Sequence, residues 1–227
     1  MTNNPSFSVI MLATPEIDSY ANHTSQNWAH YCERHGYSYE RKQERMYDDM
    51  HIYWSKVGYM LQALQQCRSD WVFVVDADTL VQTQSYRLET LVKRYGDNNQ
   101  VHCLISEDCS RRLGVPLPLS LKTMRFSKTF RGANSGFFGF RTTQMGLKIA
   151  EDWLALGRTT FTRFRVEAPH EQAVFWLGIM RSYRQNVRVI GGEVMRVGGN
   201  PFLDWLLTDT SSAFVLHDKG IKQRCAA

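Results

Sequence analysis

Short apolar runs alternate with longer stretches of helical periodicity along the first hundred residues. The runs 7–13 and 71–75 have the length of buried strands, whereas apolar positions in 20–35 and 54–67 follow helical spacing, with Gly36 ending the first of these stretches. This alternation is typical of a mostly parallel sheet with helices on its faces. Sheets of this kind bind ligands beyond the carboxyl ends of their strands.

The rest of the chain continues the pattern. Further helices are predicted over 86–94, 145–156 and 171–183, and further strands over 101–106, 134–141, 187–190 and 214–216. A chain of 227 residues that is 43% hydrophobic can bury one substantial core, and no internal repeat or linker divides it. We therefore expect a single α/β domain over 1–227.

Composition excludes several classes of protein. The net charge of +5 suits an anionic small ligand but is too small for a nucleic-acid coat. Five cysteines without a C-x-x-C pair argue against a disulfide framework and a zinc knuckle. No basic n-region precedes the first apolar run, and no run approaches the ~18 residues that cross a bilayer. A cytoplasmic protein without a signal peptide or transmembrane segment is expected.

The strongest charge bias lies in 111–141, which holds seven Lys or Arg and no Asp or Glu. Pro116 and Pro118 indicate that its first half, 111–131, is a surface loop. A solvated loop and a loop that binds the acceptor are both compatible with this pattern. Peripheral contact with anionic lipid is a further option, and no nucleic-acid motif accompanies the segment.

The chemistry-bearing signal is the strand 71–75 followed by Asp76-Ala77-Asp78. Two carboxylates one residue apart bind a hard divalent ion such as Mg²⁺ or Mn²⁺, which would join the protein to a substrate diphosphate. The structural alternative is a turn in which Asp78 caps the next element. Phosphatases of the haloacid dehalogenase type also place D-x-D after a strand, but with Thr two residues beyond the second Asp. Here Thr79 follows at once.

Several further segments occur in an order that resembles one enzyme family. They are Tyr31-Cys-Glu-Arg-His-Gly-Tyr37, Trp54-Ser-Lys56, Asp76-Ala-Asp78, Asn134-Ser-Gly136 with Arg141, His170-Glu-Gln172 and His217-Asp-Lys-Gly220 with Lys222. Together they resemble the galactosyl/mannosyl/xylosyltransferase family of nucleotide-sugar glycosyltransferases. The resemblance implies a GT-A fold, a Rossmann-like mixed sheet flanked by helices. Its nucleotide-binding half would end near residue 80, with an acceptor-binding half over 81–227.

The resemblance also implies roles for individual residues. Asp76, Asp78 and His217 would bind Mn²⁺ or Mg²⁺. The donor, expected to be a UDP-sugar, would contact Lys56, Asp76, Ala77, Asp78, Gly136, Gly220 and Lys222. Gln172, Glu171, Asn134 and Lys222 would act at the reacting sugar, with Lys222 neutralising the departing diphosphate. His170 stands where the family has an acidic residue, which makes the donor sugar the least transferable inference.

The residues taken alone leave alternatives open. Lys56 is equally compatible with a surface position on a helix, and Asn134-Ser-Gly136 is equally compatible with a turn. Glu171 is compatible with an acidic residue that favours the dipole at a helix N-terminus. The resemblance implies transfer of a sugar to a glycan or other acceptor with retention of configuration. An inverting enzyme with Glu171 as general base is the second option. A phosphatase and a catalytically silent nucleotide-sugar-binding subunit are the others, and the oligomeric state is left open.

Overall fold

The computed structural model describes residues 5–107, 133–191, 193–198, 213–218 and 221. Within these ranges six strands form one sheet in the order β2-β1-β3-β6-β5-β7. Their bounds are β1 (Phe7–Leu12), β2 (Ser38–Lys42), β3 (Trp71–Asp76), β5 (Cys103–Glu107), β6 (Ala133–Arg141) and β7 (Val187–Ile190). Only β6 runs against the others among these six, so the sheet is mostly parallel as predicted.

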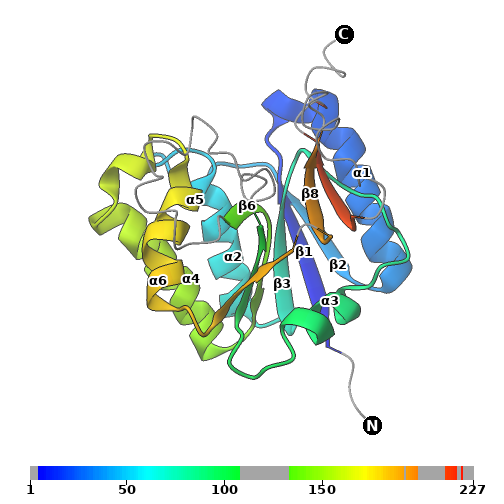
Figure 1. Ribbon diagram of the computed structural model, residues 1–227. Coiled ribbons are helices and arrows are strands. Elements are labelled where there is room, and N and C mark those ends of the chain that lie inside the picture. The colour runs from blue at the N-terminus through cyan, green and yellow to red at the C-terminus, as the bar shows by residue number, and fades with distance from the viewer. Residues whose placement is uncertain (1–4, 108–132, 192, 199–212, 219–220, 222–227) are drawn as a thin grey trace.

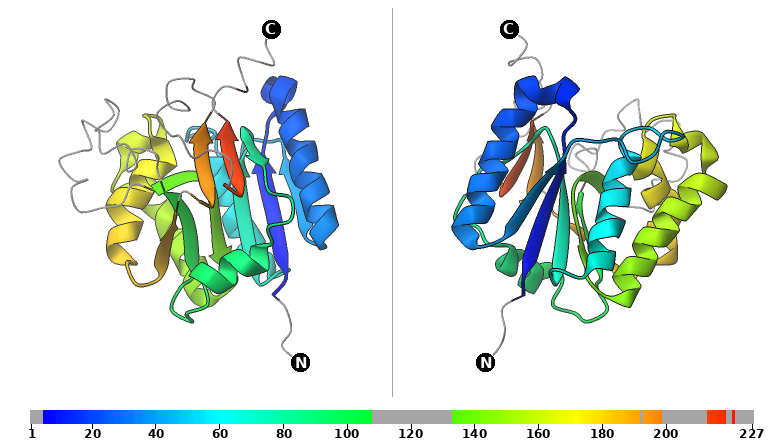
Figure 2. Two further views of the ribbon diagram at one scale, coloured as in Figure 1. Left: turned by 45° about the vertical axis from the view of Figure 1, so that its right-hand side comes forward. Right: turned by 180° about the vertical axis from the view of Figure 1, so that it is seen from behind.

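Helices cover both faces of this sheet (Figures 1 and 2). One face carries α1 (Asp18–His35) and α3 (Leu88–Tyr95); the other carries α2 (Trp54–Gln66), α4 (Gln144–Thr159) and α5 (His170–Val174). Among the helices of the described ranges, none combines the length and apolar character needed to cross a membrane.

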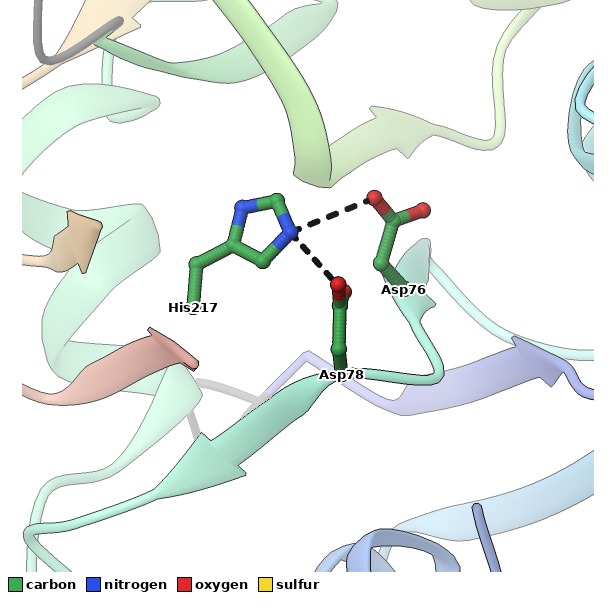
Figure 3. Close-up of side chains that lie close together, drawn as sticks. All are labelled: Asp76, Asp78 and His217. Atoms are coloured by element: carbon green, nitrogen blue, oxygen red, sulfur yellow. Dashed lines mark ion pairs between the residues drawn. The ribbon is translucent and has the colours of Figure 1, made fainter. Parts of the chain in front are cut away.

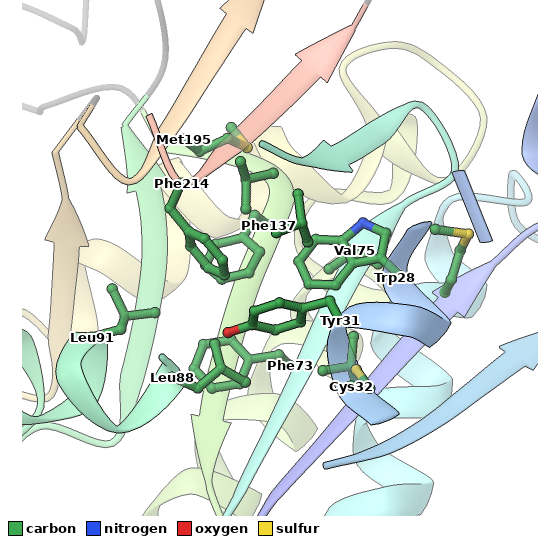
Figure 4. Close-up of a cluster of buried hydrophobic side chains, with 14 of the residues drawn as sticks. Trp28, Tyr31, Cys32, Phe73, Val75, Leu88, Leu91, Phe137, Met195 and Phe214 are labelled. Atoms are coloured by element: carbon green, nitrogen blue, oxygen red, sulfur yellow. The ribbon is translucent and has the colours of Figure 1, made fainter. Parts of the chain in front are cut away.

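The inner strands divide their side chains between two cores, because successive residues of a strand point to opposite faces. In β3, Phe73 and Val75 pack on the α1 side with Trp28, while Val72 and Val74 pack on the α2 side. Figure 4 shows the first of these cores, in which rings from α1, β3 and β6 meet. Strands buried on both faces read as continuous apolar runs, which is why β1 and β3 were visible in the sequence.

A second, small sheet lies over the α1 face. In the described residues it has the order β4-β9-β8, with β4 (Thr79–Val81), β9 (Val215–Asp218) and β8 (Met195–Gly198). Its middle strand brings the C-terminal part of the chain beside the segment that comes after β3. The sequence predicted only the middle strand, as 214–216.

The predicted helix 171–183 is interrupted. The structure has α5, then a π-helical stretch over Phe175–Ile179, then α6 (Met180–Ser182). Five residues of π-helix are too few for hydrophobic spacing to reveal. The basic segment 111–131 lies outside the described residues.

Candidate functional site

Helix α1 fixes the turn that carries the two carboxylates. Strand β3 ends at Asp76, and β4 begins at Thr79. Thr24 Oγ1 donates a hydrogen bond to the Ala77 carbonyl at 2.6 Å, and Trp28 Nε1 donates to the Thr79 carbonyl at 3.2 Å. These hydrogen bonds from α1 fix the backbone between the two carboxylates, and so they preorganise both side chains.

The second sheet brings His217 to these carboxylates. Antiparallel pairing of β4 and β9 sets Thr79 opposite His217. His217 Nε2 lies 2.8 Å from Asp78 Oδ1 and 3.6 Å from Asp76 Oδ2 (Figure 3). One ligand atom from each of the three residues lies within 4.8 Å of the others. Two carboxylate oxygens and an imidazole nitrogen fit Mn²⁺ or Mg²⁺ with coordination positions left for a diphosphate.

Gly136 of β6 leaves room for the His217 ring. A Cβ atom at Gly136 would lie 2.6 Å from His217 Cε1 and 2.8 Å from Asn134 Oδ1, too close for any side chain. Asn134 Oδ1 accepts a hydrogen bond from the Gly136 N–H at 2.7 Å. Gly136 thus lies against a protein imidazole, and residues 134–136 belong to strand β6 rather than to a turn.

Lys56 is buried and joins two carboxylates. Its Nζ atom lies 2.6 Å from Asp76 Oδ1 and 3.0 Å from Glu171 Oε1, and it donates to the Ser135 carbonyl at 3.2 Å. The side chain is 4% exposed, which excludes the surface alternative. Burial alone would lower the pKa of Lys56, but Asp76 and Glu171 more than offset it and hold that pKa above the usual range. The cationic form is therefore the stable one.

Glu171 lies at the start of α5, but it does more than favour the helix dipole. Its Oε1 atom also accepts a hydrogen bond from Ser135 Oγ at 2.8 Å. Its Oε2 atom is buried and has no hydrogen-bond partner among the described residues. Neighbouring Gln172 accepts at Oε1 from the Ser135 N–H at 3.2 Å. Strand residues 134–136 thus contact both Glu171 and Gln172 of α5 through Ser135, and His217 through Gly136.

Three rings that the sequence analysis did not assign to the site complete it. His51 and His170 stack with centroids 3.8 Å apart and planes 6° from parallel, and Tyr53 meets both edgewise. Residues 51 and 53 lie in an irregular segment before α2, and nothing in the sequence links them to residue 170. The departure from the family pattern at His170 was the one available signal.

A cavity of about 620 Å³ joins all of these groups. Of the predicted site residues, it brings together Lys56, Asp76, Ala77, Asp78, Asn134, Glu171, Gln172 and His217. Gly136 lies directly behind His217. Gly220 and Lys222 lie outside the described residues. The volume is in the range of small-molecule sites, about 300–1,000 Å³.

Comparisons with known proteins agree with this architecture. A model of the galactosyl transferase GMA12/MNN10 family matches residues 6–188. Galactomannan galactosyltransferase 1 of Cyamopsis tetragonoloba is 24% identical over 136 residues, 60% of this chain and 27% of that protein. The chain therefore aligns with about a quarter of that relative's length.

Two solved structures share the fold. One is a glycosyltransferase involved in the glycosylation of the major capsid of PBCV-1, with TM-score 0.71, 13% identity, and 98% of this chain and 99% of that chain covered. The other is mouse xyloside xylosyltransferase 1 in its apo form, with TM-score 0.56, 12% identity, and 94% and 98% covered. The fold is thus of the GT-A type, as predicted.

Proposed function

Because the chain belongs to the galactosyl transferase GMA12/MNN10 family, we propose that it is a metal-dependent glycosyltransferase that moves a sugar from a nucleotide-sugar to a glycan or other acceptor. The observation that carries this proposal is the convergence of Asp76, Asp78 and His217 at the wall of a cavity of suitable size. Family membership favours this activity over the phosphatase alternative. We propose a UDP-sugar as the donor.

The three ligands would hold Mn²⁺ or Mg²⁺, which, when bound, neutralises the diphosphate and so makes it a better leaving group. Lys56 keeps the Asp76 carboxylate in a fixed orientation toward this site. Asn134 lines the cavity, and because its Oδ1 accepts a hydrogen bond from the Gly136 N–H, its amide NH₂ would be the group that donates to a sugar hydroxyl.

We propose transfer with retention of configuration. The bond from the anomeric carbon to the diphosphate oxygen breaks, and the acceptor oxygen bonds to the same face of that carbon. The departing diphosphate oxygen takes the acceptor's proton. Glu171 Oε1 is engaged by Lys56 and Ser135, and Oε2 is buried, which supports this route over the inverting one because a general base must be open to the acceptor hydroxyl.

Thermal-shift measurements with UDP and GDP, each with and without Mn²⁺, test the donor site. A ligand that binds only the native state raises the melting temperature. We expect Mn²⁺-dependent stabilisation by UDP that is lost in Asp78→Ala and kept in Asp97→Ala, which removes an exposed carboxylate after α3. No shift of the wild type with any nucleotide would remove the donor-site assignment.

Turnover separates the enzyme from a silent binding subunit. We expect release of UDP from at least one of UDP-galactose, UDP-glucose and UDP-xylose with Mn²⁺, abolished by Asp78→Ala. Nucleotide binding without any release in the presence of pyranoside acceptors would favour the silent subunit.

A further inference from the structure

One part of the cavity is lined by aromatic rings, whereas the metal-ligand end is lined by the charged carboxylates. We call His51, Tyr53 and His170 the ring wall. The Tyr53 ring centroid lies 4.6 Å from that of His51 and 5.4 Å from that of His170. All three residues line the cavity, next to Lys56 and Glu171. Lys56 links the ring wall to the metal-ligand end, because its Nζ atom lies 5.4 Å from the Tyr53 ring centroid and 2.6 Å from Asp76 Oδ1.

Tyr53 is one of the few large hydrophobic side chains that are exposed among the described residues. It is 44% exposed, and among the described residues only Met145 and Val166 join it as exposed large hydrophobic side chains. Its ring lies at the cavity, while the backbone around it is fixed by hydrogen bonds such as Trp54 N to the His51 carbonyl at 2.9 Å. A rigid aromatic face open to a polar cavity is a surface on which an apolar ligand face can stack.

The His170 imidazole is buried and stacks on His51, but one of its nitrogens has no hydrogen-bond partner among the described residues. The residue is 8% exposed, and the nitrogen without a partner is Nδ1, which is enclosed. Its backbone φ of 50° lies in the left-handed region, which few residues other than glycine adopt. Buried polar groups are normally hydrogen-bonded, so an imidazole nitrogen without such a partner, in a residue held in a sparsely populated conformation at a cavity, points to a ligand.

The charges around the ring wall indicate a neutral ligand. Burial lowers the pKa of both His51 and His170; Glu171 opposes this shift and Lys56 adds to it, and the net direction is downward, so the imidazoles are neutral at pH 7. Lys56 lies 5.4 Å from the Tyr53 centroid, but Asp76 and Glu171 already balance its charge. The wall offers an aromatic face and neutral hydrogen-bonding nitrogens, which match a ring with C–H and hydroxyl groups.

We infer that the ring wall is a pyranose-binding subsite, in which Tyr53 stacks on the C–H face of a sugar ring and His170 hydrogen-bonds a hydroxyl. This inference rests on the proposed function and adds the place where a sugar ring is recognised. The sugar is either the one being transferred or the terminal sugar of the acceptor; both present the same chemistry to these residues.

The test uses methyl α-pyranosides of galactose, glucose and xylose as probes, with saturation-transfer NMR in Mg²⁺ and UDP. We expect wild type to bind at least one probe. Tyr53→Ala should weaken it about tenfold, Tyr53→Phe should keep it, and Met145→Ala, which removes another exposed apolar side chain, should not change it. His170→Asn, which tolerates a positive φ, should also weaken binding.

Kinetics identify the source of the sugar. If Tyr53→Ala raises the KM of the UDP-sugar in hydrolysis, the subsite holds the transferred sugar. If it raises only the KM of a pyranoside acceptor, the subsite holds the acceptor. Equal probe binding by wild type, Tyr53→Ala and His170→Asn, or no probe binding while UDP still binds, would overturn the inference and leave the proposed function standing. Absence of UDP binding would instead count against the proposed function, and the pyranoside measurements would still report on the ring wall.

Discussion

The His217 imidazole lies against the backbone of Gly136, where even a methyl group would come within 2.6 Å of its ring. The ring is almost fully buried, so it has little space to move away. Gly136→Ala should therefore displace the imidazole from Asp76 and Asp78 and weaken Mn²⁺ binding about 10- to 100-fold, as loss of a supporting contact does at metal sites. Isothermal titration with Mn²⁺ measures this.

A matched variant on the same strand provides the control. A Cβ at Gly139 would meet the Phe73 ring at 2.4 Å, in the core rather than at the metal ligands. Gly139→Ala should lower the melting temperature and keep the Mn²⁺ affinity of the folded protein. Wild-type Mn²⁺ affinity in Gly136→Ala would show that His217 is not held as a ligand.

Replacement of Lys56 should destabilise the fold. Lys56→Met leaves the carboxylates of Asp76 and Glu171 without their cation, and removing one partner of a buried ion pair costs about 3–5 kcal/mol. Urea unfolding measures the loss. Lys148→Met is the control, because Lys148 forms an exposed i,i+4 pair with Asp152 and should cost less than about 1 kcal/mol.

A second substitution separates charge from packing. Glu171→Gln removes one of the two uncompensated charges, so Lys56→Met/Glu171→Gln should be more stable than the sum of the single variants indicates. Strictly additive losses would mean that Lys56 acts through packing of its aliphatic chain.

Much of this architecture was accessible from the sequence, for identifiable reasons. Strands such as β3 are buried on both faces and form continuous apolar runs, and α1 ends at a glycine with φ of 72°. The pairing of Asp76 with Asp78 is local and therefore visible. His217 was expected only through the family resemblance, since it lies far along the chain from Asp78 and no periodicity reports such a contact.

The features that the sequence did not predict depend on tertiary packing. The burial of Lys56 results from two carboxylates supplied by β3 and α5, so its helix alone left a surface position equally plausible. The stacking of His51 on His170 requires the segment before α2 to meet the start of α5, a contact between irregular residues with no sequence signature. Strand β4 has three residues, too few for alternation to be recognised.

The stacked histidines predict a stability that falls with acidification. Burial lowers the pKa of both His51 and His170 in the folded protein, and their mutual repulsion adds to the effect at His170. Below the unfolded value of about 6.5, the unfolded chain binds more protons than the folded one, so stability falls as the pH drops through this value.

Urea midpoints at pH 7.5 and pH 5.5 measure this dependence. The wild-type midpoint should fall more between these pH values than that of His170→Asn, because this variant lacks the His170 imidazole and therefore its repulsion with His51. Parallel losses in the two proteins would assign the acid sensitivity to other groups.

The configuration of the product tests the proposed role of Glu171. Its Oε1 accepts hydrogen bonds from Lys56 and Ser135, its Oε2 is buried, and its side chain is 2% exposed, so neither carboxylate oxygen is open to an acceptor hydroxyl. With an α-linked UDP-sugar, the first product seen by proton NMR should therefore be the α-glycoside. Glu171→Gln should lower the rate, because it disturbs the Lys56 bridge, while keeping the α configuration. A β-linked first product from the wild-type protein would contradict retention and make Glu171 the candidate general base.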